Sequence, residues 1–182
     1  MQKRFALNFG CGKDIKKEDG EFIWDNVDMQ YSNKLTAIFD FDKLPYDNLE
    51  DNKYDFILMS HVLGHLIYPD RVLYELWKKC RHKAIIRIVV GHYGNKGSYQ
   101  DLRHKTYFCE ETFLHFAQTK EYIQKHSKFK IKRLYSNPTI IGKFFPKRLR
   151  KILSLFIGGL ISTIVCEYEV NKMQEQKDYL WE

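Results

Sequence analysis

Short apolar runs separated by polar segments characterise the first half of the chain. Residues 5–9, 22–27, 35–41 and 54–59 each have the length and composition of a β-strand. The run at 54–59 is almost continuously apolar, which is typical of a central parallel strand buried on both faces. Residues 84–90 are rich in β-branched side chains and predict a fifth strand. The pattern therefore predicts an α/β chain with a parallel sheet.

A helical spacing of apolar residues replaces the strand pattern further along the chain. Pro69 opens a predicted helix that runs to about Arg81, where basic residues suit the negative end of the helix dipole. Residues 110–126 are also predicted to be helical. Residues 128–135 and 163–170 complete the set of predicted strands.

Two connections between these elements have unusual lengths. Residues 13–20 are polar and leave too little chain for a full crossover helix, although parallel strands usually need a dozen or more connecting residues. We therefore expect a minimal fold in which this connection is reduced to a turn or two. Residues 91–108 form a long predicted loop, and its aromatic and histidine content favours a functional loop over a disordered one.

Two glycines directly follow the first predicted strand. Gly10 and Gly12 can adopt positive φ without steric cost, and a side chain at either position is expected to occupy a ligand's space. Asp28 ends the next strand-like run. This arrangement is the one in which an open α/β sheet holds an adenosine-containing cofactor at the carboxyl ends of its strands. A dinucleotide dehydrogenase would need a third glycine three residues after Gly12, where Ile15 stands.

Size and charge add to this picture. A chain of 182 residues, 44% of them hydrophobic, suits one domain with a sizeable core. Residues 1–70 contain 8 Lys/Arg and 13 Asp/Glu, whereas residues 71–182 contain 22 and 10, which gives the second half a net charge of +12. RNA phosphates, an anionic membrane or an acidic substrate would suit this half, and so would a lysine-rich surface that only maintains solubility.

Cysteine spacing and hydropathy favour a cytoplasmic protein. The four cysteines are far apart and form no CxxC pair, so neither a disulfide framework nor a metal site is indicated. A strand is predicted within a few residues of Met1, which leaves no room for a signal peptide. Residues 152–166 are uncharged, but a membrane span needs about 20 apolar residues. We therefore expect no transmembrane segment.

Five ordered sequence blocks carry a resemblance to a known family. They are Leu7 to Gly12, Val27 to Met29, Phe39 to Tyr46, Tyr54 to Leu63 and Asp70 to Leu73. In this order and spacing the chain resembles a class I S-adenosylmethionine (SAM)-dependent methyltransferase, and more narrowly the small type 11 methyltransferases. The match covers roughly residues 4–110.

The resemblance implies a Rossmann-like, doubly wound, mostly parallel seven-stranded sheet whose last strand is antiparallel. The fold would be a minimal single domain over residues 1–182. Within it, residues 1–90 would form the cofactor-binding half and residues 91–170 the acceptor-side loop, helices and last strands. Residues 171–182 would form a polar tail.

The resemblance also implies a binding site for SAM. Asp28 would accept hydrogen bonds from both ribose hydroxyls, and a bidentate carboxylate suits a diol whatever the family. Asp40 would take the adenine amino group, and the residues after the fourth strand would border the sulfonium and the acceptor. The implied cofactor-binding residues are Asn8, Gly10, Cys11, Gly12, Asp28, Met29, Asp40, Phe41, Ser60 and His61.

The chain departs from the family pattern at three places. Asn8 stands where Asp is frequent, and a carboxylate at this position is expected to raise the affinity for the cofactor. Gly64 replaces the Glu of a common His-Val-Leu-Glu-His stretch. Residues 81–84 replace a Pro-Gly-Gly turn. The first two departures touch the predicted cofactor and acceptor sites.

Histidines are the main candidates for a general base. An alcohol acceptor must lose a proton on methylation, and histidine is suited to accept it near neutral pH. Residues 101–104 partly match an Asp-Pro-Thr-His stretch of similar proteins, so His104 is either an acceptor-site base or a structural residue of the loop. The catalytic candidates are His104, His61, His92 and Asp101. His61 and His65 are spaced i, i+4, but without a third ligand one pocket residue and one core residue explain them better than zinc.

The predicted function is transfer of a methyl group from SAM to a small-molecule or glycan-like acceptor. Two alternatives stay open: an RNA methyltransferase that uses the basic second half, and a SAM-binding pseudoenzyme. Residues 143–157 begin basic and continue as a predicted apolar helix. This segment is predicted either to contact an anionic membrane, which would make the protein peripheral, or to cover the sheet or the active site. We favour the second interpretation because the sheet needs cover.

Overall fold

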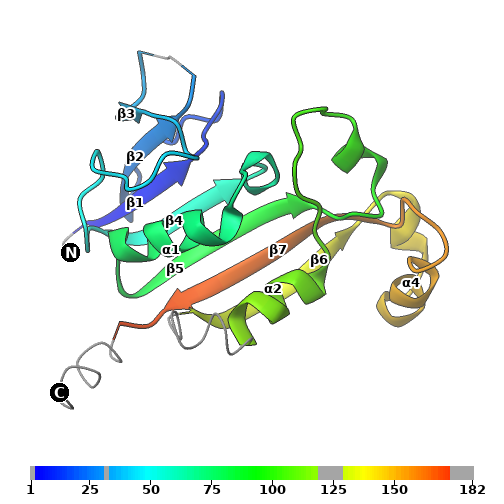
Figure 1. Ribbon diagram of the computed structural model, residues 1–182. Coiled ribbons are helices and arrows are strands. Elements are labelled where there is room, and N and C mark those ends of the chain that lie inside the picture. Colours follow the sequence, from blue (N-terminus) through cyan, green and yellow to red (C-terminus); the bar gives the residue numbers. More distant parts are fainter. Residues whose placement is uncertain (1–2, 31–32, 119–128, 173–182) are drawn as a thin grey trace, which may run out of the picture.

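The chain folds around one seven-stranded mixed sheet with the strand order β3-β2-β1-β4-β5-β7-β6 (Figure 1). The structure is a computed structural model and describes residues 3–30, 33–118 and 129–172. The strands are β1 (Arg4–Phe9), β2 (Phe22–Asp28), β3 (Ala37–Ile38), β4 (Tyr54–Ser60), β5 (Cys80–Gly91), β6 (Phe129–Pro138) and β7 (Ile161–Val170). β7 runs antiparallel to both of its neighbours, and the other pairs are parallel. The predicted Rossmann-like fold class is confirmed.

Within the described residues, three α-helices and three 3-10 helices lie between the strands. The α-helices are α1 (Pro69–Lys79), α2 (Glu110–Gln118) and α4 (Lys147–Leu153), and the 3-10 helices are η1 (Leu63–His65), η2 (Lys96–Tyr99) and η3 (Ile141–Phe144). Helix α1 follows the prediction closely. The predicted helix at 110–126 is confirmed as far as Gln118, and its remainder lies outside the described residues.

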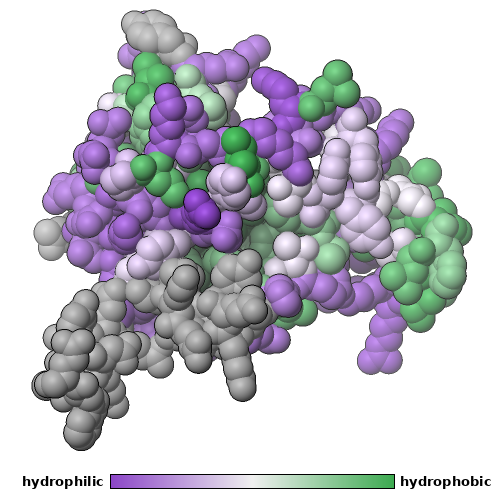
Figure 2. Space-filling view, viewed as in Figure 1, coloured by the Kyte–Doolittle hydropathy of each residue, from purple (hydrophilic) through white to green (hydrophobic). Residues whose placement is uncertain are grey.

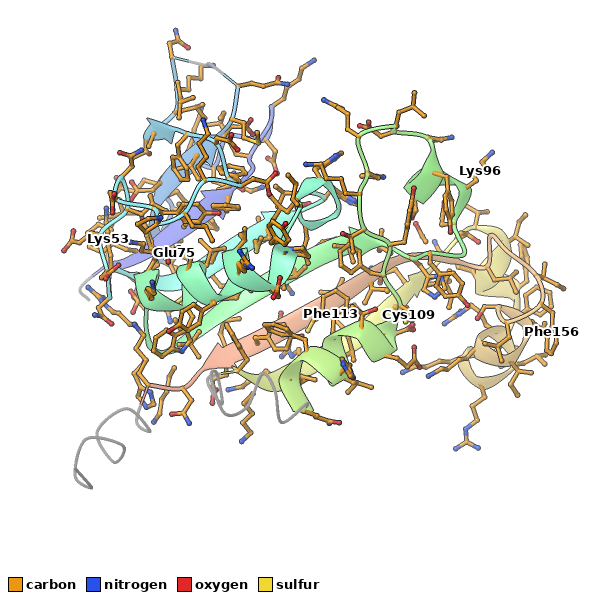
Figure 3. All side chains as sticks on the ribbon, in the orientation of Figure 1. Lys53, Glu75, Lys96, Cys109, Phe113 and Phe156 are labelled. Atoms are coloured by element: carbon orange, nitrogen blue, oxygen red, sulfur yellow. The ribbon has the colours of Figure 1, made fainter. Side chains whose placement is uncertain are left out.

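The core lies on the sheet face that α1 and α2 cover (Figure 1). Rows of fully buried side chains cross four adjacent strands on this face, because residues paired between strands point the same way. One row is Leu7, Ile57, Ile86 and Tyr168, and the next is Phe9, Met59, Ile88 and Cys166. The Tyr168 hydroxyl donates a hydrogen bond of 2.8 Å to the Phe113 carbonyl of α2. In Figure 3, Phe113 lies between α2 and the sheet.

The opposite face is more polar, and neither α1 nor α2 covers it. Its central row is Asn8, Leu58, Arg87 and Glu167, with an ion pair of 2.9 Å between Arg87 and Glu167. Residues 10–21, which connect β1 to β2, contain no helix. The predicted minimal crossover is therefore present, and its consequence is a helical layer concentrated on one face of the sheet.

Two predicted elements differ from the structure. The predicted strand at 35–41 shrinks to Ala37–Ile38 because Phe41 turns into the core and stacks on Phe9, with ring centroids 3.9 Å apart. The predicted apolar helix within 143–157 is wrong. Helix α4 is the basic stretch Lys147–Leu153, and turns follow it. It has no buried residue, so the favoured interpretation of this segment as cover for the sheet is also wrong.

Candidate functional site

The two glycines after β1 have different roles. Gly10 has a φ of +71°, and a Cβ built there would lie 2.5 Å from Cγ2 of Val62. Gly10 therefore makes room for a protein side chain, and the expectation that a ligand needs this space is wrong for this residue. Gly12 has a φ of +53°, and a Cβ there would meet no heavy atom within 4 Å. Of these two glycines, Gly12 is the one that faces open space.

Asp28 holds this glycine loop from the carboxyl end of β2. Its Oδ2 accepts a hydrogen bond of 2.7 Å from the Gly12 amide, and its Oδ1 accepts one of 3.0 Å from the Gln30 amide. Met29 follows and is 50% exposed. Cys11 lies buried beside the loop, and burial together with the Asp28 charge raises the pKa of its thiol to about 11. The residues predicted to bind the cofactor at the ends of β1 and β2 therefore lie close together.

Asn8 is buried, with an exposed fraction of only 2%. Its Nδ2 donates to the Asp14 carbonyl at 2.7 Å and to Oδ1 of Asn26 at 3.0 Å. Asn26 in turn exchanges two hydrogen bonds with the backbone of Lys16. The two amides fasten the helix-free crossover to the sheet, so the Asn8 side chain has a structural task.

Asp40 and Phe41 lie at the carboxyl end of β3, as predicted, but with different environments. Oδ1 of Asp40 accepts from the Asp42 amide at 3.0 Å, and the Asp40 carboxylate remains partly exposed. The Phe41 ring is buried in the core, and its carbonyl accepts from the Tyr46 hydroxyl at 2.6 Å. Asp42 accepts from the Ile67 amide at 2.8 Å and approaches Lys105 at 3.2 Å. This carboxylate therefore links the segment after β3 to the long loop.

The carboxyl end of β4 meets the long loop at Gly64. Ser60 ends the strand, and His61 follows with a φ of +57°. The Gly64 carbonyl accepts hydrogen bonds from the amides of Lys105 and Thr106, at 2.8 and 3.2 Å. A Cβ at Gly64 would lie 3.3 Å from both the His104 ring and the Thr106 carbonyl. The departure from Glu at this position thus lets the loop lie close to η1.

A cavity of about 180 Å³ opens between the carboxyl ends of β4 and β5, the long loop and the start of β7. Pockets at this edge are where open α/β sheets bind their ligands. Its polar lining includes His61, Asn95, Ser98, His104, Tyr107 and Thr163. His61 and His104 were predicted. Asn95 and Ser98 were not, although the Asn-Lys-Gly sequence at 95–97 marks a turn that could have signalled them.

The His104 ring is held by a backbone carbonyl of the long loop. Its Nδ1 lies 2.7 Å from the Ser98 carbonyl, which can only accept, so Nδ1 carries the proton and Nε2 keeps a free lone pair. The His65 ring packs on the His104 ring with a centroid distance of 4.4 Å. Desolvation, followed by the nearby His104, lowers the pKa of both His61 and His65. This shift favours the neutral form of both rings.

The other two catalytic candidates do not line the cavity. His92 is buried, its Nδ1 accepts from the Gly94 amide at 3.0 Å, and its Nε2 lies 3.6 Å from Glu110. The hydrogen bond to His92 holds the pKa of Glu110 at about 2. Asp101 is paired with Arg103 at 2.6 Å, and this contact lowers the pKa of the Asp101 carboxyl. Both side chains are occupied in shaping the long loop.

A metal site and a membrane-spanning helix are both absent from the part of the chain that the structure describes. Within residues 3–30, 33–118 and 129–172, no three His, Cys, Asp or Glu side chains are placed to hold a metal ion. Over the same ranges, no helix combines the length and apolar character needed to cross a membrane.

Comparisons with known proteins identify the fold. No family model matches the chain, and no curated protein sequence matches it. Solved structures do. A SAM-dependent methyltransferase from Archaeoglobus fulgidus superimposes with a TM-score of 0.64 at 16% identity, over 92% of this chain and 86% of that one. A second, from Mesorhizobium loti, gives 0.59 at 13% identity, over 92% and 91%.

A third similar structure comes from a complex between the Haloferax volcanii Trm112 methyltransferase activator and the putative methyltransferase. Its TM-score is 0.61 at 12% identity, over 94% of this chain and 84% of that one. The [4+2]-cyclase SpnF also shares the fold, with a TM-score of 0.56 at 13% identity, over 93% and 76%. The chain therefore has the fold of the SAM-dependent methyltransferases. Because the sequence identities are low, its reaction has to be inferred from the residues of the site.

Proposed function

We propose that the chain binds SAM at the carboxyl ends of β1 and β2 and transfers its methyl group to a small-molecule or glycan-like acceptor. The observation that carries this proposal is the contact between Gly10 and Val62. It brings the glycine loop beside His61, the residue that precedes Val62, which lines the acceptor cavity. The two halves of a transfer site thus meet where the strand order reverses between β1 and β4, as ligand sites in open α/β sheets do.

The residues at the first of these halves fit the cofactor. Gly12 leaves the space above the loop open. Each oxygen of Asp28 holds one backbone amide and retains lone-pair capacity for a ribose hydroxyl. Asp40 adds a partly exposed carboxylate beyond it, where an adenine amino group would find an acceptor.

The histidines of the cavity suit the chemistry of methyl transfer. SAM supplies a methyl group on a positively charged sulfonium, and transfer is an in-line displacement that depends mainly on positioning. His61 lines the cavity and His65 packs on His104, and desolvation lowers the pKa of both rings, which disfavours a second positive charge beside the sulfonium. Nε2 of His104 is free to accept the proton that an acceptor hydroxyl loses. His104 is therefore the proposed general base.

Calorimetry with S-adenosylhomocysteine, the demethylated cofactor, tests the binding half of the proposal. We expect binding by the unaltered chain and a loss of at least about tenfold in Asp28→Ala, because a bidentate carboxylate contact is removed. Asp14→Ala is the matched control, since Asp14 follows the glycine loop and its side chain is 70% exposed and paired to Lys16. The proposal is wrong if no binding occurs or if both variants bind equally.

Two alternatives have support of their own. The net charge of +12 in the second half suits an RNA acceptor, and one similar structure comes from a complex with a methyltransferase activator. A pseudoenzyme that binds SAM without transfer would resemble the proposed enzyme in every binding test. Labelled-methyl transfer to sugars, lipids and RNA separates the three, with transfer from SAM to a small acceptor expected and His104→Gln expected to abolish most of it.

We also propose a reducing, cytoplasmic location, and a division of labour in which residues 1–90 hold the cofactor and residues 91–170 the acceptor. All four cysteines are free. Burial raises the pKa of Cys166 to about 12, which keeps this thiol protonated. The assignment of the two halves is supported by the glycine loop and Asp28 in the first half and by the cavity loop in the second.

A further inference from the structure

A basic and apolar projection lies at the β6–β7 end of the molecule. We call residues 140–157 the tip; it comprises η3, α4 and the turns around them. Figure 2 shows hydrophobic surface gathered over α4, and in Figure 3 Phe156 lies at the outer edge, away from the sheet. Phe144 and Phe156 are each 82% exposed. The exposed apolar side chains of the tip are Ile140, Ile141, Phe144, Leu149, Ile152, Leu155, Phe156 and Ile157.

The backbone of the tip holds these side chains outward. The Thr139 hydroxyl donates to the Gly159 carbonyl at 2.6 Å and closes the base of the projection. Arg150 of α4 donates to the Gly142 carbonyl of η3 at 3.1 Å, which ties the two short helices together. A Cβ at Gly142 would lie 1.9 Å from the carbonyl of Leu160, the residue before β7, so this close approach requires glycine. The apolar side chains of the tip are therefore exposed because its own backbone contacts hold them there.

The charge of the tip has one sign. It contains Lys143, Lys147, Arg148, Arg150 and Lys151 and no acidic residue. Lys147 and Arg148 are exposed, and Lys151 makes a long contact of 3.4 Å with Glu111. Cations interleaved with large aliphatic and aromatic side chains suit an anionic bilayer, where head groups meet the charges and acyl chains receive the apolar groups. RNA would engage the cations but would leave the aliphatic side chains in water.

The tip adjoins the acceptor cavity. An open groove of about 790 Å³ is bordered by Ile140 and Ile141 of the tip and by Gly94 to Lys96 of the long loop. Asn95 and Ser162 line both this groove and the acceptor cavity. The Gly159 amide donates to the Gly94 carbonyl at 2.7 Å, which fixes the base of the tip to the loop. A surface bound to the tip would therefore lie close to the cavity.

We propose that the tip binds an anionic membrane surface and so brings the acceptor cavity against the lipid head groups. The first part stands on the tip alone. The second part rests on the proposed function, because it takes the cavity to be the acceptor site.

Vesicle co-sedimentation tests the tip directly. Without cofactor, the chain should bind vesicles of phosphatidylcholine with phosphatidylserine and bind phosphatidylcholine alone more weakly. The variants Phe144→Ser with Phe156→Ser, and Lys147→Glu with Arg148→Glu, should each weaken binding at least about tenfold. Two matched controls should bind as the unaltered chain does: Leu102→Ser, at a side chain 99% exposed, and Lys13→Glu with Lys17→Glu, at two exposed lysines.

Three outcomes would overturn the membrane proposal. They are no binding to phosphatidylserine vesicles, binding that the tip variants leave unchanged, and retention on poly(U) RNA in place of vesicles. Calorimetry with S-adenosylhomocysteine on the same variants separates this proposal from the proposed function. The tip variants should bind this ligand normally, and a chain that binds vesicles but not the ligand would refute the methyltransferase proposal alone.

Discussion

At the scale of single residues, Gly10 and Gly12 look equivalent in the sequence and differ in what surrounds them. Gly10 is packed against Val62, whereas Gly12 borders open space. Both have positive φ, so replacing either with alanine costs about 1–2 kcal/mol from the backbone alone. Only Gly10→Ala adds a steric conflict inside the protein.

We predict that Gly10→Ala destabilises the fold more than Gly12→Ala does, by a further 1–3 kcal/mol or so from overpacking. Urea unfolding measures the difference. Val62→Ala removes the nearest methyl group, so the double variant with Gly10→Ala should lose less stability than the two single losses combined. Equal stabilities for Gly10→Ala and Gly12→Ala would show that the Val62 contact is unimportant.

At the scale of elements, the crossover from β1 to β2 is fixed by side chains where a helix would normally pack. Asn8 and Asn26 satisfy the backbone of Asp14 and Lys16, and both side chains are buried on two neighbouring strands. A helix satisfies its own backbone groups, whereas an irregular segment needs such partners. The absence of a helix in this crossover therefore explains why an amide side chain stands at Asn8.

We predict that Asn8→Asp lowers the free energy of unfolding by about 1–3 kcal/mol and does not strengthen cofactor binding. The new carboxylate would face two acceptor oxygens, the Asp14 carbonyl and Oδ1 of Asn26, without a proton to donate. Urea unfolding and calorimetry with S-adenosylhomocysteine measure the two effects. The exposed Asn33→Asp is the control, with a change within about 0.5 kcal/mol. Tighter binding by an equally stable Asn8→Asp would restore the expectation from the family pattern.

At the scale of the whole molecule, one core on one face of the sheet carries the fold, and the ligand-binding edge runs along the carboxyl ends of its parallel strands. His61 and His65 stand at that edge with lowered pKa values, caused first by desolvation. The unfolded chain, with a histidine pKa of about 6.5, binds protons more readily than the folded one. Stability must therefore fall as the pH drops from 6.5 toward the folded pKa values.

We predict that the free energy of unfolding falls between pH 7.5 and 5.5, and that His61→Gln with His65→Gln reduces this slope. Urea unfolding across the pH range measures it for both chains. Glu110, with its pKa of about 2, changes the stability in the same direction but at more acidic pH, where protonation of its carboxylate removes the stabilising contact with His92. An unchanged slope in the double variant would mean that the two histidines titrate alike in the folded and unfolded chains.

The sequence by itself determined the strand runs, the glycine loop, the place of Asp28 and the short crossover, because hydrophobic periodicity and backbone freedom are local properties. It also singled out His61 and His104 for the site. Only the tertiary structure decided that Asn8, His92 and Asp101 are held by structural partners, and that Asn95 and Ser98 join the cavity wall. It alone placed the tip outside the core. These outcomes depend on which distant segments become neighbours across the sheet, and that information is absent from any local pattern.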